Sequence, residues 1–241
     1  MNYRTYIKAI GILFILFLLN GCLYPQGELE KNKVPNEAQL QSVQNAVETY
    51  KEENNGLVPI KTKPNETPIF QKYLIDFSIL KEANILTDIP GNAYENGGIY
   101  QYAILNPEEE NQVKLIDLRI TEEVRRVNVQ LDLYRNEHMY PPFGEKLAKD
   151  VYTIDYEKLG LDSSPYVKSP YSDNNLPLIM DSKGKLYVDY RIDLNEALKE
   201  YDHNYEMGDD IRFILAENTP FLPAYSYPYT IKDNEPIFME K

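Results

Sequence analysis

Apolar side chains recur with helical spacing in two segments that lie 84 residues apart. In chain order, the apolar positions are Leu40, Val43, Val47 and Tyr50, then Val124, Val127, Leu131 and Tyr134. Spacings of three and four residues place such side chains on one face of an amphipathic helix. We expect the first helix to begin at Asn36, where Gln39 resembles the second half of a capping box. The second is expected to begin at Thr121, with Glu122 and Glu123 at the positive end of the helix dipole.

The features that follow each helix also come in the same order. That order is a proline, a strand-like apolar segment, a proline turn, and a glycine followed by tyrosines. The first set is Pro59, IDFSIL (75–80), Pro90 and ENGGIYQYAI (95–104); the second is Pro141 and Pro142, YTIDYEKL (152–159), Pro170 and DSKGKLYVDYRI (181–192). Chance could supply the helix match alone, but the shared order favours an internal duplication. We therefore predict an α+β fold with tandem repeats over residues 37–118 and 119–192, each a helix followed by a small antiparallel sheet.

Residues 193–241 are expected to close the fold. Leu194, Leu198 and Tyr201 lie on one face of a helix predicted from Asp193 to about Tyr201. The segment DIRFILAE (210–217) has the composition of a strand, and a proline-rich tail follows it. We predict a C-terminal helix and a strand-like tail.

The first 21 residues have the organisation of a secretory signal peptide. Arg4 and Lys8 precede an uninterrupted apolar run over residues 9–19. A helix of that length rises only about 16 Å, about half of a bilayer's hydrocarbon core. The sequence Leu19-Asn20-Gly21-Cys22 then resembles a bacterial lipobox, although Asn20 departs from the usual residue type. The alternatives are an ordinary signal peptide and an uncleaved anchor helix.

The lipobox resemblance implies cleavage between Gly21 and Cys22 and attachment of diacylglycerol to Cys22, the only cysteine of the chain. Two acyl chains hold a protein on a membrane stably. Residues 22–36 carry glycine and proline among polar residues and are expected to form a flexible tether. With no second cysteine, the fold is expected to lack disulfides.

The charge balance excludes one class of partner. Removing residues 1–21 also removes Arg4 and Lys8, so 23 basic residues face 38 acidic ones and the net charge falls from −13 to −15. Nucleic-acid binding requires a positive surface, so we expect none. An acidic body should also stand off from anionic lipid.

No sequence motif indicates catalysis, a metal or a cofactor. His138 and His203 lie near predicted helix ends and outside metal-binding spacings, so both are interpreted as structural. The acidic runs at 108–110 and 209–210 are typical of solvated loops. The oxygen-rich segments SDNN (172–175) and DSKG (181–184) offer Ca²⁺ ligands, but neither fits the EF-hand spacing. We predict a non-enzymatic protein without catalytic residues, metal ligands or cofactors.

Tyrosine is the most conspicuous residue type, with 21 copies and no tryptophan. Near the C-terminus, Tyr225, Tyr227 and Tyr229 lie two residues apart and would share one face of an extended segment. They are candidates for a ligand or partner surface, for example one that stacks on sugars. The alternative is that the rings cover the sheet and only their hydroxyls reach water.

Four segments resemble an uncharacterised family of YphF-like lipoproteins of Bacillus-like Gram-positive bacteria. They are GCLYPQ, QLQSVQNAVETY, GLVPIKTK and IPGNAYENGG. The resemblance implies an anchor on the outer face of the cytoplasmic membrane, and it brings no known activity or catalytic residue. AVETYKEENNGLVPI and NAYENGGIYQYAI also resemble the globular part of type IV pilins and pseudopilins. The long N-terminal pilin helix is absent, so we expect no filament role.

Three hypotheses of function follow. The first, which we favour, is a lipid-anchored envelope protein that docks an unidentified envelope protein through an exposed apolar or tyrosine-rich patch. The second is a lipoprotein that binds a cell-wall glycan, a peptide or a transporter solute. The third is a cell-wall hydrolase, which would need a deep pocket with convergent carboxylates or a metal.

Overall fold

The computed structural model describes residues 33–240, with side chains described from residue 37 onward. Gln39–Lys241 form one compact unit. The predicted signal peptide, the cleavage point at Gly21 and the lipidation site at Cys22 lie outside the described residues. So do residues 22–32 of the predicted tether. Among the described residues, no helix has the length and apolar character needed to cross a bilayer.

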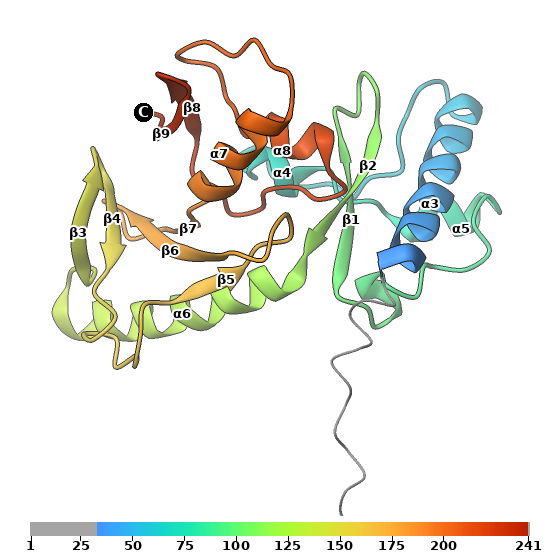
Figure 1. The fold of residues 1–241 in the computed structure, drawn as a ribbon. Helices are drawn as coiled ribbons and strands as arrows, with labels where there is room; N and C mark the ends of the chain where they lie inside the picture. Colours follow the sequence, from blue (N-terminus) through green and yellow to red (C-terminus); the bar gives the residue numbers. More distant parts are fainter. Residues whose placement is uncertain (1–32, 241) are drawn as a thin grey trace, which may run out of the picture. The chain divides into compact units, whose positions relative to one another are not determined.

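The described residues form an α+β fold, as the sequence predicted, and every pair of neighbouring strands is antiparallel (Figure 1). In chain order the elements are α3 (Lys33–Glu53), α4 (Ile69–Lys72), α5 (Phe77–Glu82), the 3₁₀ helix η1 (Tyr94–Asn96), β1 (Tyr100–Leu105), β2 (Gln112–Asp117), α6 (Leu118–His138), β3 (Phe143–Ala148), β4 (Val151–Ile154), β5 (Tyr166–Lys168), β6 (Asn175–Asp181), β7 (Leu186–Val188), α7 (Arg191–Glu200), α8 (Phe213–Asn218), β8 (Tyr229–Lys232) and β9 (Glu235–Phe238). The strands form three sheets: the β1–β2 hairpin, a five-stranded sheet and the β8–β9 hairpin. In the five-stranded sheet the order is β3-β4-β6-β5, and β7 also pairs with β6.

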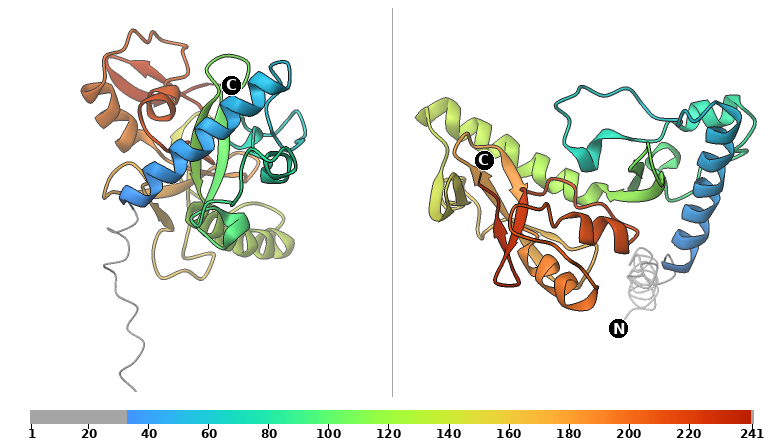
Figure 2. Two further views of the ribbon diagram at one scale, coloured as in Figure 1. Left: turned by 90° about the vertical axis from the view of Figure 1, so that its right-hand side faces the viewer. Right: turned by 90° about the horizontal axis from the view of Figure 1, so that it is seen from above.

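The two long helices bury the faces that the sequence pattern predicted. Val43 and Val47 of α3 are fully buried and pack with Tyr102 and Leu115 of the β1–β2 hairpin. Figure 2 shows α3 lying across this hairpin. The stripe on α6 packs against the five-stranded sheet and also includes Ile120. Both helices are therefore amphipathic elements held by tertiary packing.

Both predicted helix starts were three residues too late. α3 begins at Lys33, so Asn36 lies inside the helix. α6 begins at Leu118, and its N-cap is Asp117, whose carboxylate accepts the backbone N–H of Arg119 at 2.9 Å. Thr121 and its two glutamates therefore lie within the helix and do not start it.

Two segments that were predicted as strands are helical. In IDFSIL, Asp76 caps α5 by accepting the backbone N–H of Ser78 at 3.0 Å. In DIRFILAE, the residues from Phe213 onward form α8, and Ile214 and Leu215 are buried. Short apolar runs do not distinguish a buried strand from a buried helix, and here the polar groups just before each run favoured the helix.

The tandem-repeat prediction is not confirmed. The first segment builds a two-stranded sheet, whereas the second contributes to a sheet of five strands. The glycines also have different places. Gly97 ends η1 with φ +83°, ahead of β1, while Gly184 lies in the turn between β6 and β7 with φ +78°. The similar order of residues therefore does not produce two similar sheets.

An Asp-X-Arg tripeptide stands at the start of three helices. The three are Asp117-Leu118-Arg119 before α6, Asp189-Tyr190-Arg191 before α7 and Asp210-Ile211-Arg212 before α8. In each, the aspartate carboxylate accepts a hydrogen bond from the backbone N–H of the arginine two positions later. The guanidinium of that arginine also donates to the same carboxylate. In α6 and α7 the carboxylate thereby satisfies a free N–H of the first helical turn, in α8 it satisfies that of the N-cap residue, and in all three the arginine neutralises its charge.

A third apolar cluster joins the β1–β2 hairpin to the C-terminal segment. Phe70 and Leu74 pack with Ile116 of β2, and Ala216 and Leu222 belong to the same cluster. Backbone hydrogen bonds add to it, since Leu115 N–H donates to Pro220 and Leu222 N–H donates to Leu115. The C-terminal segment thus packs directly on the hairpin that ends just before α6.

Lys114 of β2 belongs to this junction. Its Nζ donates to the backbone carbonyls of Glu217 and Thr219, at 3.1 and 2.8 Å, where α8 ends. Burial lowers the pKa of Lys114 to about 8, against the opposing effect of Glu217 and Glu110. The folded protein therefore releases this proton at lower pH than the unfolded chain does.

We expect Lys114 to make stability rise with pH in mildly alkaline solution. Because the folded pKa lies below the unfolded one, the unfolded chain binds more protons, and the free energy of unfolding increases by about 2 kcal/mol from about pH 7.5 to about pH 9.5. Denaturant titrations of wild type and Lys114→Met at both pH values measure this, and the difference between the two proteins removes the tyrosine contribution that they share. Equal pH dependence in the two proteins would refute the assignment.

Candidate functional site

The tyrosines predicted as a surface lie mostly inside the fold. Tyr227 and Tyr229 are buried, and each packs edge-on or tilted against Phe238 of β9. Tyr225 has φ +58°, which breaks the extended geometry that would align the three rings, and it is partly buried. The structure does not bring the three rings together on one exposed face, so they offer no ligand platform.

Both histidines have structural surroundings. His138 ends α6, where its Nδ1 lies 3.1 Å from the carbonyl oxygen of Tyr134 and its ring stacks on that tyrosine with the centroids 4.1 Å apart. This is the helix-end interaction that the sequence predicted. His203 lies in the loop after α7, with its ring 5.7 Å from that of Tyr205. Its Nδ1 is buried without a hydrogen-bond partner among the described residues.

The acidic groups stay dispersed. Over residues 33–240, no cluster of three or more histidine, cysteine, aspartate or glutamate side chains has an arrangement that could hold a metal ion. The DSKG segment instead makes a turn, in which the carboxylate of Asp181 accepts the backbone N–H groups of Lys183 and Lys185 at 2.9 Å. Asp193, the best-buried of the acids in this region, accepts hydrogen bonds from Ser169 and Ser172.

The outer face of α6 carries a surface that the sequence reasoning missed. With about 3.6 residues per turn, Val129 and Leu133 fall on the side of the helix opposite to the buried stripe. Their exposed fractions are 52% and 57%. Arg125 precedes them at the same four-residue spacing, is exposed, and has no ion pair among the described residues. Figure 1 shows the other side of this helix lying along β5 and β6.

The turn that ends α6 adds two more exposed side chains. Met139 is 90% exposed and Tyr140 is 53% exposed. Met139 is also strained, because it takes a left-handed conformation, with φ +67°, at a position where glycine is the favoured residue. Strained residues that persist often serve a function, and exposed methionines and tyrosines are enriched in protein interfaces. We call Arg125, Val129, Leu133, Met139 and Tyr140 the α6 surface.

A sequence signal for part of this surface exists. On an amphipathic helix, apolar residues that lie off the buried stripe have no packing role, and Val129 and Leu133 are such residues. Met139 carries no such signal, since its backbone conformation is known only from the structure.

Comparison with known proteins bears on the segment before α6. Residues 36–117 match the family model described as the YphF family N-terminal domain. The matched segment ends at Asp117, the last residue of β2 and the N-cap of α6, so α6 and everything after it lie beyond the match. Curated proteins gave no match, nor did solved structures, so the likeness to pilins stays a prediction. The segment from residue 36 to the end of β2 is therefore similar to the N-terminal domain of the YphF family.

Proposed function

We propose that the chain is a non-enzymatic protein of the cell envelope that docks a partner protein through the α6 surface. A lipid on Cys22 anchors it on the outer face of the cytoplasmic membrane. The lipobox-like sequence before Cys22 supports the anchor. Docking rests on one observation, the exposed apolar side chains on the outer face and C-terminal turn of α6.

The chemistry of this surface defines the partner. Val129 and Leu133 offer apolar contact area, and Met139 is a flexible thioether that adapts to the shape of a partner. Arg125 lies one helical turn before Val129, and no carboxylate of residues 37–240 forms an ion pair with it. The partner that fits is a protein with an apolar patch and a carboxylate beside it.

Met139→Gly separates docking from folding. Glycine adopts the left-handed conformation without a Cβ penalty, so we expect the free energy of unfolding to rise by about 0.5 to 1 kcal/mol. Loss of the exposed thioether should at the same time lower capture of the partner by about three- to tenfold. Thermal unfolding and crosslinked capture from membranes measure the two effects.

Asn84→Gly is the matched control for this test. Asn84 also has a positive φ, +58°, and is exposed just after α5, away from the α6 surface. Its replacement should leave capture unchanged. If Met139→Gly raises stability and captures as much partner as wild type, Met139 is not part of a docking surface.

A further inference from the structure

A cleft lies between the first half of α6 and the segment that leads into β5. It has a volume of about 530 Å³, within the range of small-molecule sites. α6 contributes Arg119, Ile120, Glu123 and Arg126, and the facing wall is formed by residues 160–168. Arg126, which lines the cleft, is next to Arg125 in the chain, but no residue of the α6 surface lines the cleft.

The cleft is less acidic than the chain as a whole. The whole sequence has 25 basic and 38 acidic residues, but the lining has three basic side chains against the two acids Glu123 and Asp162. The basic groups are Arg119, Arg126 and Lys168. Asp117, which is bound to Arg119, brings the acids to three, so the basic and acidic groups balance and an anionic ligand meets less repulsion here than the net charge of the chain implies.

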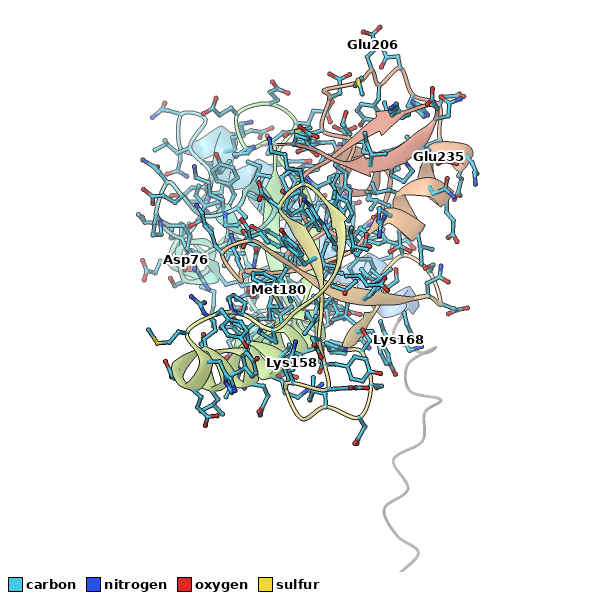
Figure 3. All side chains as sticks on the ribbon, turned by 90° about the vertical axis from the view of Figure 1, so that its left-hand side faces the viewer. Asp76, Lys158, Lys168, Met180, Glu206 and Glu235 are labelled. Carbon is cyan, nitrogen blue, oxygen red and sulfur yellow. The ribbon has the colours of Figure 1, made fainter. Side chains whose placement is uncertain are left out.

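The basic groups are oriented and still have donors to offer. Arg119 binds Asp117 through Nε and Nη2, and Arg126 binds Glu123 through the same two atoms. In neither arginine does Nη1 have a partner among the described residues, and a guanidinium has five N–H donors. Lys168, at the end of β5, is exposed, and its ammonium group has no hydrogen bond or ion pair within the described part of the chain (Figure 3). Guanidinium groups held in this way are suited to a carboxylate.

The remaining lining favours a polyhydroxylated ligand. Ile120, Pro165 and Val167 are buried, so their apolar side chains offer little area to a ligand. Tyr166 is the exception, with 46% of its surface exposed. Ser163 and Ser164 are exposed beside it, and no hydrogen bond is found for either hydroxyl among the described residues. One aromatic ring with several hydroxyl and guanidinium donors matches a sugar ring better than it matches apolar peptide side chains.

From these contacts we infer that the cleft binds a saccharide that carries a carboxylate. The sugar ring stacks on Tyr166, its hydroxyls bond the two serines, and its carboxylate is bound by Lys168 and the free N–H groups of the two arginines. This inference is independent of the docking proposal, because its contacts do not involve the side chains of Leu133 or Met139.

Titration calorimetry of the full chain in detergent tests the assignment. The acidic probe is the disaccharide of N-acetylglucosamine and N-acetylmuramic acid, and the neutral probe is N,N′-diacetylchitobiose. We expect saturable binding of the acidic disaccharide and at least about tenfold weaker binding of the neutral one. No saturable binding of the acidic disaccharide at about 10 mM, or equal affinity for both sugars, overturns the inference. A short peptide with a free C-terminal carboxylate that binds more tightly than the sugar overturns it as well.

Two variants locate the binding. Tyr166→Ala and Lys168→Gln should each lower the affinity for the acidic disaccharide by about tenfold. Tyr94→Ala and Lys183→Gln replace exposed residues outside the cleft and should bind as wild type does. All four positions are exposed, and thermal unfolding checks that each variant folds. If the cleft variants match their controls, the sugar binds elsewhere and the assignment is wrong.

Discussion

Replacing Asp189 with alanine is expected to lower the free energy of unfolding by about 3 kcal/mol. Asp189 is 4% exposed, and its carboxylate accepts from Nε and Nη2 of Arg191 at 3.0 and 2.6 Å and from the backbone N–H of Arg191. It also lies 3.1 Å from the hydroxyl of buried Tyr229. Removing the carboxylate leaves a cation without its partner and an uncapped first turn of α7.

The geometry around this pair explains why it should matter more than other ion pairs. The guanidinium of Arg191 lies over the ring of Phe238, 4.4 Å from the centroid, so it is fixed between β9 and the start of α7. The Tyr229 hydroxyl accepts the backbone N–H of Tyr190 at 3.2 Å, which ties β8 to the same helix start. Asp189 therefore connects α7, β8 and, through Arg191, β9.

Denaturant titration measures this effect, with Glu123→Ala as control. Glu123 holds Arg126 in a similar forked pair on the surface of α6, and its removal should cost no more than about 0.5 kcal/mol. If Asp189→Ala does not fold, Asp189→Asn keeps the acceptor oxygen and should retain part of the lost stability. A cost for Asp189→Ala as small as that for Glu123→Ala would contradict the structural role assigned to the pair.

Leu133→Asp is expected to reduce partner capture by about thirtyfold or more. A central apolar side chain of an interface typically contributes about 2 kcal/mol, and a buried aspartate would add the cost of desolvating its charge. Because Leu133 is exposed in the free protein, the free energy of unfolding should change by no more than about 0.5 kcal/mol. The yield of crosslinked adduct from membranes, together with thermal unfolding, measures both.

Leu57→Asp provides a matched control for this substitution. Leu57 is 69% exposed in the turn after α3, so the same charge is introduced at another exposed leucine. We expect wild-type capture from this variant. Equal loss of capture in both variants would mean that added negative charge alone weakens binding, and the α6 surface would lose its assignment.

The parts of the fold that the sequence predicted are those with long periodic patterns. The apolar positions from Val124 to Tyr134 predicted α6, because their spacing of three and four residues is enough to show one buried helix face. The start of α6 was mispredicted because the signal there is an Asp-X-Arg tripeptide, which Asp117, Asp189 and Asp210 each begin just before a helix. No such tripeptide precedes α3. A search for that tripeptide before apolar runs would have placed α8 correctly.

The candidate sites depend on features that no linear pattern contains. The alternation of Tyr225, Tyr227 and Tyr229 suggested a surface, but the β8–β9 hairpin folds two of these rings into the core. The strain at Met139 is a backbone property, and the cleft exists because residues 160–168 fold against α6. Composition predicted an acidic protein, yet basic and acidic groups balance at the cleft, because the net charge of a chain does not say where the charges lie.

Photo-crosslinking from position 133 in intact membranes tests the central claim most directly. A photoreactive amino acid replaces Leu133 in the full chain, and the same residue at position 57 serves as the matched control. We predict one discrete protein adduct from position 133, none from position 57, and loss of the adduct from position 133 when Cys22→Ala releases the protein from the membrane. No adduct from position 133, or the same adduct from both positions, would contradict docking through the α6 surface.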